Sequence, residues 1–240
     1  MEDFDLRPAR DLGLRPDDRA RSLRREPGLR EVCLCHIWWG LARVYLKLYH
    51  RLTIRGRRHL PSGPPFVLVA NHTSHLDTLM LASALPVRHR RYVFPISAGD
   101  VFFETRLAAR FSSVFLNALP MWRHRAGRHE LGELRERITA GDAGFILFPE
   151  GTRSPDGRMQ PFLPGVGMLL AGTDVPVVPC GLTGAFAGLP RGATRPRPVR
   201  LRVRVGRPMR FDRIANRRAG WEHVAGDLER RVRCLTRPGS

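Results

Sequence analysis

The chain has 240 residues and a formal net charge of +19, a length that suits one sizeable folded domain. Lys47 is the only lysine, so arginine carries almost all of the positive charge. A basic surface favours anionic membranes, phosphorylated substrates or nucleic acid as partners. Nucleic acid is not expected, because no nucleic-acid-binding motif with interleaved aromatic residues is found in the sequence. Four cysteines fit neither a zinc site nor a disulfide framework, which favours thiols in a reducing compartment: Cys33, Cys35, Cys180 and Cys234.

The first 52 residues divide into two segments. Residues 1–28 are highly charged, contain three prolines and lack periodicity, which predicts a disordered or weakly ordered arm. The acidic start has no apolar signal region behind it, which argues against secretion. Residues 29–52 mix aromatic and aliphatic residues with charges too frequent for a membrane span. They predict an amphipathic helix, lying either in a membrane interface with its aromatic residues inward or docked on the domain by the same face.

The α/β domain is expected from residue 53 to residue 240. The apolar run from Pro64 to Ala70 predicts a strand buried on both faces. Polar residues 71–77 follow it, and a helix is expected from Thr78. Open α/β sheets place their chemistry at the carboxyl ends of strands. The stretch Asn-His-Thr-Ser-His-Leu-Asp is therefore the first candidate site.

His72 and Asp77 have the residue types of a general base and its partner. An imidazole can take a proton from a hydroxyl if a carboxylate holds its other nitrogen protonated. One alternative is that this stretch only caps a helix. Another is a metal site with His75 as a further ligand, but a binuclear pattern would need histidines where Thr73 and Thr78 stand.

The middle of the chain predicts further strands and helices around a second polar loop. Strands are expected over residues 91–97, 114–119 and 144–148, with a helix capped by Asp100 and an amphipathic helix over residues 127–140. After the last of these strands, Glu150 and Arg153 flank a Gly-Thr turn. An arginine there can bind a phosphate with two parallel hydrogen bonds. The other interpretation is a tight turn with a local ion pair.

The remaining chain predicts the rest of the sheet and its cover. A short helix is expected over residues 165–172, then a strand over 175–179. In residues 199–205, apolar residues alternate with arginines, which predicts a strand near the sheet edge with a basic outer face. A terminal amphipathic helix over residues 221–235 would turn Val224, Leu228 and Val232 inward.

Together, His-Thr-Ser-His-Leu-Asp and Phe-Pro-Glu-Gly-Thr-Arg-Ser, in this order, resemble the glycerolipid acyltransferases, the family of 1-acylglycerol-3-phosphate acyltransferases. The segment ending in Met121-Trp122-Arg123 looks like the family's second block, and Val175-Pro176-Val177-Val178-Pro179 looks like its fourth. Many relatives have Phe-Lys-x-Gly after the glutamate motif, whereas this chain has Phe162-Leu163-Pro164-Gly165. That departure leaves the acceptor less defined than the reaction.

The resemblance implies a mixed, mostly parallel sheet flanked by helices, and a set of site residues. His72 and Asp77 would be catalytic, while the acceptor would bind to Glu150, Gly151, Thr152, Arg153 and Arg123, with Arg158 as a further phosphate ligand. Residues Val175, Pro176, Val177, Val178 and Pro179 would line an acyl groove. The amides of Gly151 and Thr152 are candidate oxyanion donors.

The resemblance implies transfer of a fatty acyl group from acyl-CoA or acyl carrier protein to a lysophospholipid hydroxyl, best 1-acylglycerol 3-phosphate. No metal or cofactor is expected beyond the thioester substrate. The protein would act at the cytoplasmic face of the cell membrane, bound peripherally or monotopically to an anionic surface. Two alternatives remain: another lyso-lipid acceptor, or a basic membrane-binding module without activity.

Overall fold

A seven-stranded sheet forms the centre of the computed structural model, which describes residues 8–98, 103–121 and 128–237. The strand order is β1-β7-β6-β2-β5-β3-β4, and all described pairs are parallel except β6 with β7. The strands are β1 (Thr53–Arg55), β2 (Phe66–Ala70), β3 (Val93–Ala98), β4 (Leu119–Met121), β5 (Gly144–Leu147), β6 (Val177–Thr183) and β7 (Arg202–Val205). The mixed, mostly parallel sheet expected from the sequence is confirmed.

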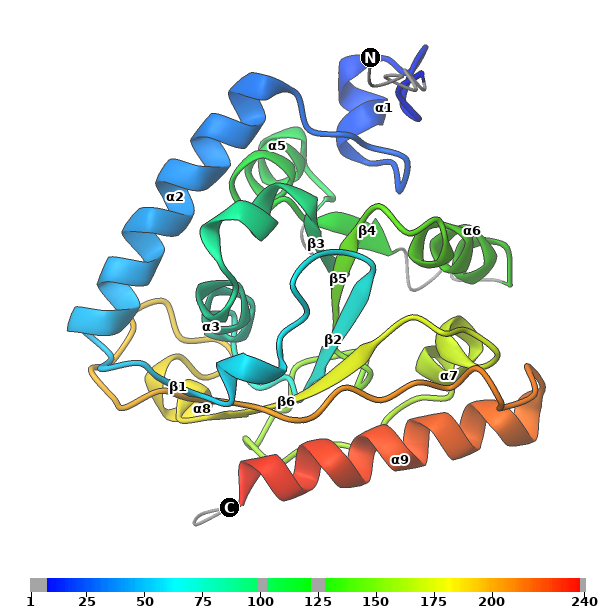
Figure 1. The fold of residues 1–240 in the computed structure, drawn as a ribbon. Helices are drawn as coiled ribbons and strands as arrows, with labels where there is room; N and C mark the ends of the chain where they lie inside the picture. The colour runs from blue at the N-terminus through cyan, green and yellow to red at the C-terminus, as the bar shows by residue number, and fades with distance from the viewer. Residues whose placement is uncertain (1–7, 99–102, 122–127, 238–240) are drawn as a thin grey trace.

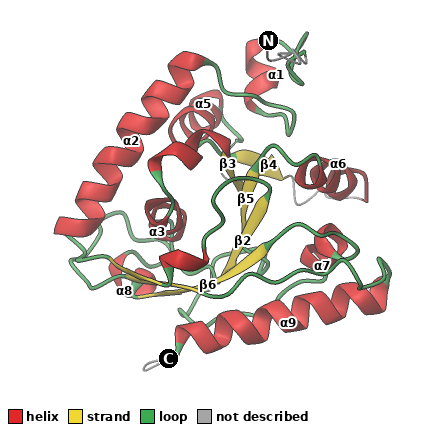
Figure 2. Ribbon diagram, viewed as in Figure 1, coloured by secondary structure: helices red, strands yellow, loops and turns green. Residues whose placement is uncertain are grey.

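Helices cover both faces of this sheet (Figures 1 and 2). The α-helices are α1 (Pro16–Ala20), α2 (Leu29–Leu48), α3 (Leu76–Ala84), α5 (Arg106–Phe115), α6 (Arg128–Thr139), α7 (Gly165–Leu170), α8 (Ala185–Gly188) and α9 (Arg218–Thr236). Two short 3-10 helices are η1 (Arg57–His59) and η2 (Val87–Tyr92). The expected strand over residues 114–119 is wrong at its start: α5 runs to Phe115, and β4 begins only at Leu119.

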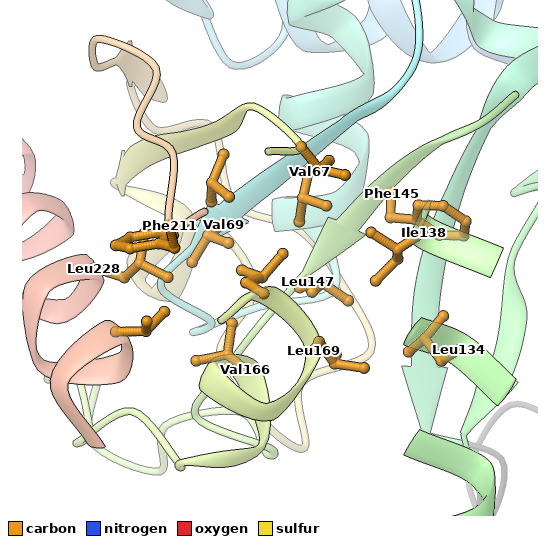
Figure 3. Packing of buried hydrophobic residues seen from close by; sticks show 14 of the residues in the cluster. Val67, Val69, Leu134, Ile138, Phe145, Leu147, Val166, Leu169, Phe211 and Leu228 are labelled. Atoms are coloured by element: carbon orange, nitrogen blue, oxygen red, sulfur yellow. The ribbon is translucent and has the colours of Figure 1, made fainter. Parts of the chain in front are cut away.

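Strand β2 explains why the sheet needs cover on both faces, since all of its residues are buried. Val67 and Val69 point into a core shared with α6, α7 and α9, in which Phe145 and Leu147 of β5 also lie (Figure 3). Phe66, Leu68 and Ala70 point to the opposite core, shared with α2 and α3. Alternate residues of a strand face opposite sides of the sheet, so the unbroken apolar run places β2 in the middle.

Helix α9 binds the sheet through the residues that its periodicity predicts. Val224, Leu228 and Val232 are all fully buried. Helix α7 lies so close that a Cβ atom at Gly167 would come within 2.1 Å of the Trp221 carbonyl oxygen. Glycine is therefore required where these two helices meet.

The N-terminal segment differs from the expected arm over its described part. Residues 8–28 include α1 and pack on the domain, and Arg25 is almost completely buried. The Arg25 guanidinium donates to Asn117 Oδ1 at 2.6 Å and lies 3.3 Å from a Glu31 carboxylate oxygen. The sequence pattern missed this order because the buried anchor is a charged residue.

Helix α2 docks on the domain by its aromatic face, which is one of the two placements that the sequence left open. Trp39 is buried with Cys35 and Ala42 against α3. The Trp38 ring contacts Phe111 and Phe115 of α5 edge-on, with both pairs of ring centroids 5.7 Å apart. The aromatic residues therefore face the protein, as in the docked alternative, and not lipid. Within the described residues, no helix has the length and hydropathy needed to cross a bilayer.

Candidate active site

Asn71 sets the direction in which the chain leaves β2. Its side-chain amide donates to the Leu182 carbonyl oxygen at 3.0 Å, and its side-chain oxygen accepts the Leu182 backbone N–H at 2.8 Å. The side chain thereby replaces a backbone partner for β6 at the end of the sheet. His72 follows at the carboxyl end of β2, where a parallel sheet commonly carries its reactive groups.

His72 and Asp77 form the pair that the sequence predicts. His72 Nδ1 lies 3.0 Å from Asp77 Oδ2, and the same oxygen accepts the backbone N–H groups of Thr73 and Ser74 at 2.6 and 2.7 Å. The Asp77 side chain is completely buried, whereas 16% of the His72 side chain is exposed. An oxygen acceptor at Nδ1 selects the tautomer in which Nδ1 carries the proton, which leaves Nε2 able to accept one.

The His72 ring lines a hollow of about 370 Å³. It stacks on Phe148, with ring centroids 4.1 Å apart and an interplanar angle of 18°. Trp38 of α2 and Phe111 of α5 also line the hollow, and so do two arginines, Arg153 and Arg191. The hollow therefore combines a base, an apolar wall and positive charge. Among the described residues, no three His, Cys, Asp or Glu side chains gather as a metal site.

Comparisons with known proteins give the family. The family model described as Acyltransferase matches residues 51–183, which is more than half of the chain. This chain belongs to the acyltransferase family. A chloroplastic 1-acyl-sn-glycerol-3-phosphate acyltransferase of Brassica napus is 34% identical over 65% of this chain and 43% of its own length. The human 1-acyl-sn-glycerol-3-phosphate acyltransferase alpha is 31% identical over 54% of this chain and 44% of its own length.

The chain spans less than half of the length of these two relatives. Its fold is similar to the crystal structure of the 1-acyl-sn-glycerophosphate acyltransferase PlsC from Thermotoga maritima, with a TM-score of 0.64 and 24% sequence identity. That similarity covers 87% of this chain and 81% of the other chain. The match supports the fold, including the helices around the sheet.

Glu150 lies in a different place from the one expected. It is buried, and its two carboxylate oxygens accept the backbone N–H groups of His72, at 2.7 Å, and Gln160, at 2.8 Å. His72 also accepts the Ser154 backbone N–H through its carbonyl oxygen at 2.9 Å. Glu150 is not among the described residues that line the hollow. Its geometry is that of a positioning residue, which joins the histidine loop to the glutamate loop.

The Glu150 carboxyl has a perturbed pKa. Burial raises this pKa from 4.5 to about 7, although the two backbone N–H groups that it accepts favour its charged form. Because the native pKa lies above the unfolded one, the stability linked to this group is complete below about pH 4.5 and is lost as the pH rises through about 7.

Glu150→Gln should remove this pH dependence, since an amide does not titrate. We expect the stability of the wild type relative to Glu150→Gln to fall between pH 5 and pH 8, by on the order of 3 kcal/mol. Urea unfolding of both proteins across this range measures the difference. Parallel pH profiles would show that Glu150 does not titrate in this window.

The glutamate turn places its small residues at the hollow. Gly151 has a φ of +72°, and its backbone N–H donates to the Phe148 carbonyl oxygen at 3.1 Å. That bond occupies the Gly151 amide, which was one of the two expected oxyanion donors. Thr152 also lines the hollow, and its amide keeps the role of candidate donor.

Arg153 lies at the hollow as expected, and Arg191 joins it. Burial lowers the pKa of the Arg153 guanidinium, and the charge of Arg191 lowers it further. The expected helper Arg158 is not among the described lining residues and instead lies 3.8 Å from the Asp156 carboxylate. Arg123 lies outside the described residues. No sequence pattern singles out Arg191, because it stands in a loop with several other arginines.

The expected acyl groove is wrong in the structure. Val175, Val177 and Val178 are core residues, and Pro179 is also buried, within β6 between β2 and β7. Pro176 precedes β6, and its carbonyl oxygen accepts the Val67 N–H. A different apolar hollow of about 150 Å³ adjoins the His72 hollow. Both hollows share four lining residues: Ile96, Ser97, Phe148 and Gly151.

Proposed function

We propose that this chain transfers a fatty acyl group from acyl-CoA or acyl carrier protein to the hydroxyl of a lysophospholipid. The preferred acceptor is 1-acylglycerol 3-phosphate. The observation that carries the proposal is the His72–Asp77 pair at a hollow that also holds Arg153 and Arg191. The names of the relatives from Brassica napus and Homo sapiens support the same acceptor.

The proposed reaction needs one base and no covalent acyl-enzyme. His72 Nε2 takes the proton of the acceptor hydroxyl as its oxygen attacks the thioester carbonyl carbon. The Asp77 carboxylate stabilises the imidazolium that forms. The tetrahedral intermediate then expels the thiolate, which receives the proton from His72. The Thr152 amide is the candidate donor to the oxyanion.

The substrate parts match the surroundings of His72. Arg153 and Arg191 supply the positive charge that a phosphomonoester requires. The adjoining apolar hollow suits a fatty acyl chain, because Leu131, Val166 and Leu169 line it. Leu163 lines it as well, at the position where many relatives have lysine.

The direct test is purified protein with lysophosphatidic acid and acyl-CoA, followed by release of free thiol. Thiol release that depends on the acceptor supports the transfer, and an acyl-carrier-protein arm compares the two donors. Release with another lyso-lipid alone would give the acceptor alternative. No release with any donor and acceptor would leave the membrane-binding module without activity as the better account.

We also propose that α2 lies on the cytoplasmic face of a cell membrane, with the protein bound peripherally or monotopically to an anionic surface. An exposed apolar stripe supports this placement, since its members recur every three or four residues along one helix face: Leu34, Ile37, Leu41, Val44 and Leu48. Leu107 and Phe111 of α5 are exposed too. Because Trp38 of α2 lines the His72 hollow, this placement would bring the hollow close to the lipid surface.

The double variant Ile37→Ser/Leu41→Ser tests the stripe without changing the charge. Both residues are more than 60% exposed, at 62% and 63%, so folding should tolerate the changes. Withdrawing two such side chains from lipid should weaken vesicle binding by about a hundredfold. Sedimentation with phosphatidylcholine vesicles that contain phosphatidylglycerol measures it. Leu12→Ser, another exposed leucine away from α2, is the control; an equal loss in both would contradict the placement.

A further inference from the structure

A third hollow, of about 270 Å³, lies where α2, α3 and the segment around β1 meet. Arg43 and Lys47 of α2 and Arg57 of η1 line it. Leu52, Ile54 and Ser83 complete its lining. We call it the cationic hollow. It shares no described lining residue with the hollow at His72.

The cations of this hollow have no acidic partner in the part of the chain that the structure describes. Within residues 8–98, 103–121 and 128–237, no carboxylate forms an ion pair with Arg43, Lys47 or Arg57. Arg57 donates to the Ser83 carbonyl oxygen at 3.3 Å. Burial lowers the pKa of both Arg57 and the nearby Arg90, and the charge of Arg43 lowers both pKa values further. The cluster therefore repels itself, and a bound anion would relieve that repulsion.

Buried polar groups beside the cluster provide an independent observation. The Ser83 side chain is completely buried, and its hydroxyl has no hydrogen-bond partner among the described residues. Arg90 is 3% exposed, and its Nε and Nη2 atoms also lack a hydrogen-bond partner among the described residues. Buried polar groups in proteins are almost always hydrogen-bonded. The Ser83 hydroxyl and the Arg90 N–H groups are donors of the type that form hydrogen bonds with an oxyanion.

The position on α2 indicates the source of the anion. Arg43 and Lys47 are one turn apart and directly precede Val44 and Leu48 of the exposed stripe. If α2 lies on a membrane by that stripe, as proposed above, its flank lies at the depth of lipid phosphates. Leu52 and Ile54 add apolar surface for the carbon atoms next to such a phosphate.

We propose that the cationic hollow binds the phosphate of an anionic phospholipid headgroup, at a site separate from the acceptor. Arg43, Lys47 and Arg57 hold the phosphate oxygens, and Ser83 adds a hydroxyl donor. The bound lipid fixes α2 on the bilayer in one orientation. That orientation keeps the mouth of the His72 hollow beside the membrane during successive turnovers.

The vesicle experiment compares two double variants of the full chain with equal net charge. Arg43→Gln/Arg57→Gln changes the cationic hollow, whereas Arg55→Gln/Arg202→Gln changes another arginine-lined surface at β1 and β7. Diffuse attraction to an anionic surface loses about fivefold for each charge removed. For vesicles that contain phosphatidylglycerol, we expect the first variant to lose at least about tenfold more affinity than the second. Equal losses would overturn the proposal.

A second experiment, in solution, distinguishes binding of a lipid headgroup from binding of free phosphate. The probes are monomeric dihexanoyl phosphatidylglycerol and inorganic phosphate, and the readout is the rise in Tm. We expect the short-chain lipid to stabilise the wild type and the control variant but not Arg43→Gln/Arg57→Gln. Ser83→Ala should weaken that binding by about fivefold. Absence of stabilisation by the lipid, or equally tight binding of inorganic phosphate, would overturn the headgroup assignment.

These readouts do not depend on acyl transfer. Lipid binding that persists while thiol release fails would refute the proposed reaction and leave the cationic hollow standing. Conversely, normal thiol release with no effect of Arg43→Gln/Arg57→Gln on either binding measurement would refute the hollow alone.

Discussion

Replacing His72 with alanine is expected to lower kcat/KM for acyl transfer by about a hundred- to ten-thousand-fold, which is the usual contribution of a positioned general base. The His72 ring borders the hollow, and its backbone bonds to Glu150 and Ser154 do not require the imidazole. The variant should therefore fold normally. Thiol release with saturating acyl-CoA, together with a thermal unfolding curve, measures both effects.

Asp77→Asn tests the positioning of that base. The Asp77 oxygen that faces His72 also accepts two backbone N–H groups. An amide oxygen can keep these three bonds but cannot stabilise an imidazolium through its charge. We expect a loss of at least about a hundredfold in kcat, with a smaller change in KM. His75→Ala is the matched control, since His75 is a second histidine that lines the same hollow. Wild-type turnover in His72→Ala would remove His72 from the mechanism.

The sequence predicted the pairing of His72 with Asp77 because the pattern is local. A buried strand with apolar residues on both faces belongs inside a parallel sheet, and polar residues at its carboxyl end mark the place of chemistry. Glu150 was predicted as a site residue for a similar reason, at the end of β5 next to β2. Its role was missed, because only the folded chain brings its carboxylate to the backbone N–H of His72.

Other features depend on contacts between distant segments. An apolar run such as Val175–Pro179 has the same pattern whether it lines a groove or fills a core, and its position between β2 and β7 makes it core. Trp38 and Trp39 match a lipid-facing pattern, yet α5 and α3 provide protein surfaces for them. The large apolar residues left facing outward on α2 are aliphatic.

The acceptor phosphate should depend strongly on Arg153 and Arg191. Removing one charged hydrogen-bonding partner of a phosphate costs about 1.5–3 kcal/mol, so Arg191→Gln should raise the KM for lysophosphatidic acid by about ten- to a hundredfold. Arg153→Lys keeps the charge but loses the two-pronged geometry of a guanidinium, and it should also raise this KM. The KM for acyl-CoA should change little in both variants. Arg158→Gln is the control, because Arg158 is 89% exposed and is not among the described lining residues.

Leu163 allows a gain-of-function test of how the acceptor phosphate is recognised. Leu163 is 54% exposed, and it lines the apolar hollow next to Gly151. Leu163→Lys would introduce the basic residue of the family pattern Phe-Lys-x-Gly at this position. The added charge should lower the KM for lysophosphatidic acid, since a phosphomonoester carries up to two negative charges, and it should not help a lysophospholipid without a terminal phosphate. Measuring the KM of both acceptors on wild type, Arg153→Lys, Arg191→Gln and Leu163→Lys decides the matter. If both acceptors respond equally to all three substitutions, these residues do not recognise the phosphate, and the acceptor is selected elsewhere.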